Sequence, residues 1–237
     1  MKRLLLMMMG LFFAVTLLAG CAQHVYSPEE PYQSRLPAGF VYVDQVIPGV
    51  QLDIRYHGEN NFVGTRIDGY HAPVGILTNE AATALKAVNQ DLNGQGYGLK
   101  VFDAYRPQKA VDHFIRWSWD LSDQKMKSFY YPNLDKSDLF DLGYLARRSA
   151  HSRGSTVDVT IVSLESGEEL DMGTPFDYLD PLSGWDAQSI NPEQTANRLL
   201  LKNIMQRHGF QAISREWWHY TLINEPYPNR YFDFNIE

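Results

Sequence analysis

Apolar residues along the chain recur at two spacings, which predicts helices mixed with short strands. Helical spacing appears over residues 79–92, where Thr78 is a suitable cap. A second helix is predicted over residues 109–119. A third follows the capping residue Asn191 and covers residues 192–207, with proline in its first turn. The apolar face of the first helix is formed by Ala81, Leu85, Val88 and Leu92.

Strand-like segments lie before, between and after these helices. Residues 40–46 and 50–56 alternate apolar and polar positions around Pro48-Gly49, and this pattern predicts a β-hairpin. Shorter β-branched or aromatic runs predict further strands, at residues 99–102, 157–162, 210–213 and 217–223. Helices and antiparallel-type strands in this order favour a single α+β domain, in which helices pack on a small antiparallel sheet.

The N-terminal segment has a different character. Lys2 and Arg3 precede an apolar run that is too short to span a bilayer, so residues 1–20 are predicted to be a secretory signal. The run ends in Leu18-Ala19-Gly20-Cys21, which resembles a bacterial lipobox, and we expect Cys21 to be lipidated. Residues 21–39 then form the lipidated cysteine and a Pro-containing tether, and residues 40–237 form the folded domain.

Composition and targeting restrict the functional classes. The formal charge of the 237 residues is −7, without a Lys/Arg-rich block, which argues against a nucleic-acid partner. The lipobox predicts an exported, periplasm-facing protein anchored to the membrane through Cys21. No Asp follows Cys21, and this favours the outer membrane in a host with two membranes. The pattern carries no signal for an oligomeric state.

Two segments contain a candidate metal site. His151 lies in a Ser/Gly-rich loop, and Asp158 lies seven residues later in a predicted strand. His219 could supply a third ligand, which leaves the fourth zinc position for water. Glu216 lies three residues before His219, where it could accept a proton from that water. The spacing alone is moderately specific, because such pairs also occur by chance.

Arg106 is a third candidate. It follows the predicted strand at residues 99–102 and precedes Pro107. A guanidinium fixed at a strand end could stabilise the oxyanion that forms when water attacks a peptide carbonyl. An ion pair with a neighbouring carboxylate explains the same residue equally well.

Together these segments resemble the zinc D,D-peptidases, and in particular the D-alanyl-D-alanine dipeptidase branch. The family motifs Ser-x-His-x-x-Gly-x-Ala-x-Asp and Glu-x-Trp-His are matched, except that Thr156 replaces the usual Ala. The resemblance extends from about Val41 to the C-terminus, and it includes residues 53–56, 61–64, 96–99, 130–133, 170–173, 176–177 and 225–229.

The resemblance implies a hedgehog-like fold, one zinc ion per chain and hydrolysis of the dipeptide D-alanyl-D-alanine in the cell envelope. It assigns the metal ligands to His151, Asp158 and His219, the general base to Glu216 and stabilisation of the tetrahedral intermediate to Arg106. It also implies that Asp177 binds the ammonium group of the substrate. Tyr56 and Ser149 are weaker candidates for substrate contacts.

Two alternatives remain open at this point. A D,D-carboxypeptidase or endopeptidase that acts on peptidoglycan stem peptides would use the same zinc ligands, but it would need an open cleft instead of an ammonium anchor. A non-catalytic lipoprotein that binds peptidoglycan would not require Glu216. The physiological purpose could be nutrient use, cell-wall recycling or glycopeptide resistance.

Overall fold

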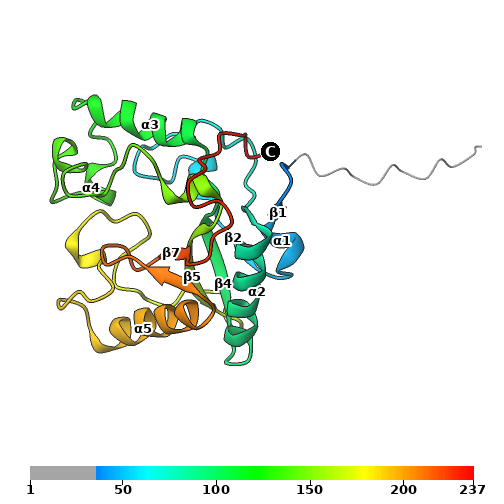
Figure 1. The fold of residues 1–237 in the computed structure, drawn as a ribbon. Coiled ribbons are helices and arrows are strands. Elements are labelled where there is room, and N and C mark those ends of the chain that lie inside the picture. The colour runs from blue at the N-terminus through cyan, green and yellow to red at the C-terminus, as the bar shows by residue number, and fades with distance from the viewer. Residues whose placement is uncertain (1–35) are drawn as a thin grey trace, which may run out of the picture. The chain divides into compact units, whose positions relative to one another are not determined.

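The β-branched and aromatic runs form a five-stranded sheet in the computed structural model, which describes residues 36–237 (Figure 1). The predicted signal, Cys21 and the tether up to residue 35 lie outside the described residues. The strand order is β2-β4-β5-β7-β6. The strands are β2 (Gln51–Leu52), β4 (Tyr97–Asp103), β5 (Thr156–Ser163), β7 (His219–Leu222) and β6 (Phe210–Ala212). A second, two-stranded sheet pairs β1 (Phe40–Tyr42) with β3 (Ile76–Thr78).

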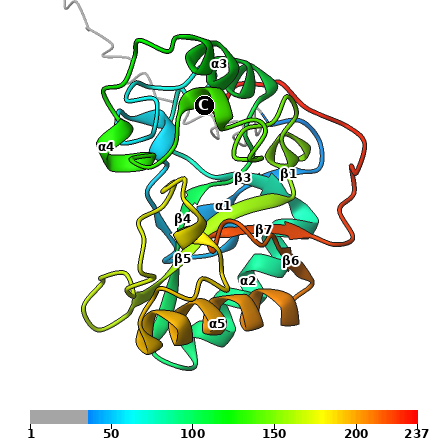
Figure 2. The same cartoon turned by 90° about the vertical axis from the view of Figure 1, so that its left-hand side faces the viewer.

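Helices cover the sheet from two sides. The longer helices α2 (Asn79–Asn93) and α5 (Pro192–Arg207) contact β4 and β6, respectively, and lie below the strands in Figure 2. Helices α3 (Gln108–Trp119) and α4 (Lys127–Tyr130) lie above the strands among long connecting segments. The remaining short helices are α1 (Val43–Val46), η1 (Arg55–His57), η2 (Lys136–Asp138), η3 (Ala150–Arg153) and η4 (Pro181–Ser183).

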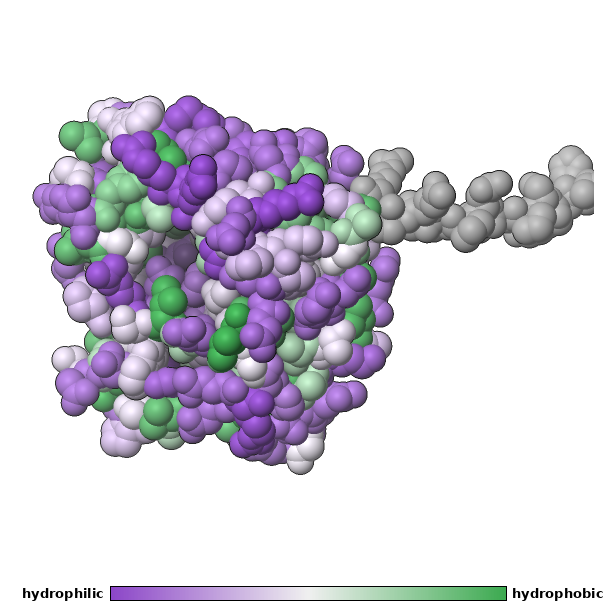
Figure 3. All heavy atoms as spheres, in the orientation of Figure 1, coloured by the Kyte–Doolittle hydropathy of each residue, from purple (hydrophilic) through white to green (hydrophobic). Residues whose placement is uncertain are grey.

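The three predicted helices are confirmed, together with the caps predicted for two of them. The Thr78 side chain accepts a hydrogen bond from the Ala81 amide, and Asn191 forms a complete capping box with Gln194. None of the helices among residues 36–237 has the length and apolar character needed to cross a bilayer. The face in Figure 3 is mostly hydrophilic, with hydrophobic residues scattered across it, as is usual for a solvated surface.

The predicted hairpin at residues 40–56 is wrong. After β1 the chain turns into α1, where the Val43 amide donates to the Gly75 carbonyl at 2.8 Å and both Val43 and Ile47 become buried. Burial of these two apolar side chains favours the helical turn over a continued strand. Strand β1 therefore pairs with the distant β3, and β2 joins the main sheet in parallel with β4. The sheet is antiparallel apart from this pair.

Strand register places the polar residues of the site in one row. Asp158 of β5 lies opposite His219 of β7, and it also lies opposite Asp103 at the end of β4. The pairing of β4 with β5 shifts between Val101 and Asp103, because two residues of β4 advance against one residue of β5. A β-bulge of this kind re-aims side chains, and here it brings Asp103 beside Asp158.

Gly154 connects η3 to β5 and has a positive φ of 80°. A Cβ at this position would lie 2.3 Å from the ring of Phe40. Gly167 has a nearly equal φ of 75°, but a Cβ there would have no other atom within 4 Å, so it is a matched control. The two glycines differ mainly in the space available for a side chain.

We therefore expect Gly154→Ala to destabilise the protein more than Gly167→Ala. The left-handed backbone alone should cost about 1 kcal/mol in both variants. Overpacking against Phe40 should add roughly 1–3 kcal/mol at position 154 only. Urea unfolding measures the difference, and equal free energies of unfolding for the two variants would contradict the steric account.

Candidate active site

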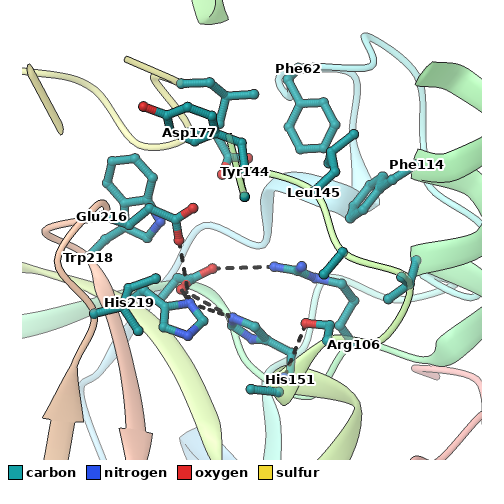
Figure 4. Close-up of a pocket in the computed structure, with 18 of the residues that line it drawn as sticks. Phe62, Arg106, Phe114, Tyr144, Leu145, His151, Asp177, Glu216, Trp218 and His219 are labelled. Atoms are coloured by element: carbon teal, nitrogen blue, oxygen red, sulfur yellow. Dashed lines mark hydrogen bonds and ion pairs between the residues drawn. The ribbon is translucent and has the colours of Figure 1, made fainter. Parts of the chain in front are cut away.

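A small cavity lies above the row of polar residues, with a volume of about 190 Å³. Its base contains His151 and His219, and Glu216 and Asp177 lie along one side (Figure 4). Asp158, which contacts both histidines, also lines the cavity. The other side carries Arg106 and a group of apolar residues, namely Phe62, Phe114 and Leu145. The volume is below the range typical of sites for drug-sized ligands, so the cavity suits a very small substrate.

Three side chains bring their donor atoms together at the base. His151 Nε2 lies 3.2 Å from Asp158 Oδ1, and His219 Nδ1 lies 3.1 Å from the same oxygen. The two ring nitrogens are 3.2 Å apart. Asp158 and His219 meet because they face each other across β5 and β7, whereas η3 brings in His151 from the side.

This donor set fits a zinc ion. Tetrahedral zinc with bonds of about 2.0–2.2 Å places neighbouring ligand atoms roughly 3.3–3.5 Å apart, close to the observed separations. Asp158 Oδ1 is buried and accepts no hydrogen bond within the described part of the chain, as expected for an atom that faces a cation. Two imidazoles and one carboxylate also leave the fourth position open, as in catalytic zinc sites.

The protonation of Asp158 and His151 suits metal binding. Burial opposes the charge on Asp158, but the neighbouring histidines His151 and His219 hold the pKa of this carboxyl below its usual value. Burial lowers the pKa of His151, which keeps the ring neutral. The opposite nitrogen, His151 Nδ1, donates to the Ala104 carbonyl at 2.7 Å, and this bond directs the Nε2 lone pair toward the cavity.

Arg106 is held by ionic and aromatic neighbours at once. Its Nε donates to Asp103 Oδ2 at 2.9 Å, and its Nη2 lies 3.5 Å from Asp158 Oδ2. The guanidinium carbon lies 4.9 Å from the centre of the Tyr56 ring. Arg106 therefore forms the ion pair that one sequence interpretation expects, and it also lines the cavity, as the proposed oxyanion role requires.

Asp103 is a site residue that the sequence reasoning did not single out. It is fully buried, and it accepts hydrogen bonds from Arg106 and from Tyr70, the latter at 2.6 Å. Its carboxylate fixes the orientation of Arg106 and also lies 3.4 Å from His151 Nδ1. Its position directly after a buried strand was the available signal, but the bulge that turns it toward Asp158 leaves no pattern in the sequence.

Glu216 lies beside the donor set without belonging to it. Its Oε2 is 3.6 Å from His219 Nδ1, and its carboxylate points into the cavity (Figure 4). Burial raises the pKa of Glu216 to about 7. A carboxylate with such a pKa can accept and return a proton near neutral pH, although a bound cation would favour its ionised form.

Asp177 lies on the same side of the cavity as Glu216 and is almost completely buried. It accepts a hydrogen bond from the Tyr56 hydroxyl at 2.8 Å. Burial and the nearby charge of Asp158 raise the pKa of Asp177 well above its usual value. Asp177 is also the one residue other than glycine with a positive φ, 60°, among residues 36–237. A cationic group in the cavity would relieve the cost of its buried charge.

The remaining candidates have structural contacts. The Ser149 side chain lines the cavity, but it also accepts a hydrogen bond from the His151 amide at 3.3 Å and caps η3. The Thr156 hydroxyl pairs with that of Thr221 at 2.9 Å, away from the cavity lining. His57 and His71, which the sequence reasoning left without a role, do not line the cavity.

The fold and the donor set define a zinc hydrolase, and comparison with known proteins identifies its family. The model of the D-ala-D-ala dipeptidase family matches residues 37–237. The D-alanyl-D-alanine dipeptidase of Enterococcus faecium is 41% identical over 199 residues, which are 84% of this chain and 98% of that protein. The corresponding protein of Streptomyces coelicolor is 43% identical over 197 residues, 83% of this chain and 98% of its own. The chain belongs to the D-ala-D-ala dipeptidase family.

The donor set predicts which substitutions remove the metal. The purified protein should hold about one zinc ion per chain, and His151→Ala and His219→Ala should each lose most of it, because two remaining ligands bind zinc weakly. Elemental analysis after dialysis measures the content. His208→Ala is the matched control, since His208 instead contacts Asp91 at 2.9 Å. Full zinc occupancy in either ligand variant would reject the assignment.

Proposed function

We propose that the protein is a zinc-dependent dipeptidase that hydrolyses D-alanyl-D-alanine into two D-alanine molecules. The observation that carries this proposal is the pairing of a three-ligand zinc site with a buried carboxylate, Asp177, in a cavity of about 190 Å³. The names of the relatives supply the D-alanyl-D-alanine substrate.

Asp177 is proposed to bind the substrate ammonium group. Its carboxylate is buried and has no basic partner within hydrogen-bond distance among the described residues. It accepts a hydrogen bond from the neutral Tyr56 hydroxyl. An ammonium group would supply the missing positive charge through charge-assisted hydrogen bonds. The apolar side of the cavity, formed by Phe62, Phe114 and Leu145, would accommodate the methyl groups. Longer peptides lack a free ammonium group at this position.

Glu216 is proposed to act as the general base. Zinc would lower the pKa of water and polarise the scissile carbonyl. Glu216 Oε2, which faces the donor set, would take the proton from the attacking water and deliver it to the departing amine. The fixed guanidinium of Arg106 would donate hydrogen bonds to the oxygen that becomes negative during the attack. Asp103 holds that guanidinium in place and so reduces the reorganisation required.

Substrate length tests this proposal. We expect efficient cleavage of D-Ala-D-Ala and little cleavage of N-acetyl-D-Ala-D-Ala or of stem pentapeptides. Blocking the amine leaves the Asp177 carboxylate buried without a cation, which should cost about 3 kcal/mol, or roughly 100-fold in kcat/KM. Measurement of D-alanine release from each peptide gives these ratios.

The variant Asp177→Asn should have a lower kcat/KM for the dipeptide. The ratio of kcat/KM for the dipeptide to that for the acetylated peptide should also fall. Asp44→Asn is the control, because Asp44 is an exposed carboxylate on α1. If the pentapeptide is hydrolysed as fast as the dipeptide, the protein is a D,D-carboxypeptidase instead. If no peptide is hydrolysed by the zinc-loaded protein, a binding function replaces the enzymatic one.

We also propose that the protein is exported and anchored by a lipid on Cys21, on the strength of the lipobox-like segment 18–21. An envelope location, with the outer membrane favoured in a host with two membranes, fits use of D-alanine as a nutrient or wall recycling better than glycopeptide resistance. Resistance would require destruction of the dipeptide in the compartment where it is made.

Expression with a labelled fatty acid tests the anchor. The wild-type protein should carry the label and sediment with membranes, because acyl chains bind bilayers strongly. Cys21→Ala should carry no label and should leave the membrane fraction. Equal labelling of both proteins would contradict lipidation at Cys21.

A further inference from the structure

Arg198 is a buried cation that lies outside the cavity. It sits on α5 and is only 1% exposed. Its Nε donates to the Met172 carbonyl at 2.6 Å, and its Nη1 donates to the carbonyls of Leu182, at 2.9 Å, and Gly184. Burial lowers the pKa of Arg198 to about 10, so the side chain remains charged at neutral pH. A buried charge is costly unless it is hydrogen-bonded, and here backbone carbonyls accept from Nε and Nη1, whereas Nη2 has no hydrogen-bond partner among the described residues.

The three carbonyls lie at the two ends of one segment of the chain. Residues 173–183, called the anchor loop below, begin directly after Met172 and end between Leu182 and Gly184, whose carbonyls bind the same guanidinium. The anchor loop contains Asp177, the proposed ammonium-binding residue. Because a guanidinium is planar and rigid, it fixes the two ends of the loop relative to each other.

A second set of hydrogen bonds joins the two ends of the anchor loop to each other and to Trp217. The hydroxyls of Thr174 and Ser183 lie 3.0 Å apart. The Trp217 indole donates to Thr174 Oγ1 at 2.9 Å, and the Trp217 amide donates to the Ser183 carbonyl, also at 2.9 Å. Trp217 directly follows Glu216 in the chain. These hydrogen bonds therefore join the segment that carries Asp177 to the segment that carries Glu216.

These connections matter because neither carboxylate lies within a regular strand or helix. Glu216 precedes β7, and Asp177 lies between β5 and η4 with a left-handed backbone. A strained conformation of this kind persists only where the surroundings hold it. The bonds from Arg198 and Trp217 supply such restraints at both ends of the anchor loop.

We propose that Arg198 is a positioning residue that sets the location of Asp177 relative to Glu216. It thereby fixes the distance between the ammonium site and the scissile bond, which determines the length of peptide that is cleaved. The inference rests on the proposed dipeptidase function and extends it to a residue that touches neither substrate nor metal.

The test compares Arg198→Met with Arg207→Met, an exposed arginine of the same helix that pairs with Asp91. Zinc content should remain at about one ion per chain in both variants. For Arg198→Met, kcat/KM for D-Ala-D-Ala should fall about 10- to 100-fold, mainly through KM, because a displacement near 1 Å has effects of this size. The preference for the dipeptide over N-acetyl-D-Ala-D-Ala should shrink by a similar factor. Arg207→Met should match the wild type.

A purely structural role would lower thermal stability but leave KM and the peptide preference unchanged at a temperature where the variant is folded. That result would overturn the proposal. Arg198→Lys provides a second test if Arg198→Met does not fold, because it keeps a cation but lacks the planar fork that bonds the Met172 and Leu182 carbonyls at the same time. It should also weaken the peptide preference, and a folded Arg198→Lys variant with wild-type kinetics would count against the proposal.

Hydrogen exchange separates this proposal from the proposed function. Amides of residues 173–183 should exchange faster in Arg198→Met, whereas those of β5 should keep their protection. This readout does not depend on the substrate. If the wild type fails to cleave the dipeptide, the proposed function fails, and the exchange rates still show whether Arg198 holds the anchor loop. Unchanged exchange in the loop would reject the role of Arg198.

Discussion

The buried carboxylate of Asp158 is the group on which the arrangement of the site depends. It faces His151 and His219 through Oδ1 and Arg106 through Oδ2, and its strand lies between the strands that carry Asp103 and His219. A buried carboxylate is stable only when positive charge or hydrogen-bond donors surround it. A zinc ion held by the three donors would neutralise the carboxylate at Oδ1, whereas Arg106 contacts Oδ2, and the sheet register keeps Asp103 and His219 beside it.

Charge balance extends this constraint to the whole cavity. Four carboxylates lie in or beside the cavity, those of Asp103, Asp158, Asp177 and Glu216. Among residues 36–237, Arg106 is the one arginine or lysine that contacts any of them there. Mutual repulsion contributes to the raised pKa values of Asp177 and Glu216, after the larger effect of burial. A dication would offset two of the negative charges, and the substrate ammonium proposed to bind beside Asp177 would offset another. The surplus of carboxylates therefore favours cationic ligands in the cavity.

The sequence predicted features that depend on local signals. The helices followed from apolar spacing and from caps such as Thr78, and the metal donors followed from motifs whose residues lie within a few positions of one another. Features set by distant pairing were missed. The false hairpin arose because the partner of β1 lies more than 30 residues away, and the role of Asp103 depends on a bulge that no residue pattern marks. Arg198 was not singled out, because its acceptors are backbone carbonyls and leave no side-chain signature.

Glu216 is proposed to move protons beside a zinc ion that three other residues hold. The most direct test of this role is the variant Glu216→Gln, assayed for zinc content and for D-Ala-D-Ala hydrolysis in the same preparation. Glu216 lies 3.6 Å from His219 and outside the donor set, so zinc should remain at about one ion per chain. The value of kcat should fall at least ~100-fold, as is typical when an acid–base group is removed. Loss of zinc together with activity would make Glu216 a ligand, and retention of activity would exclude it as the base.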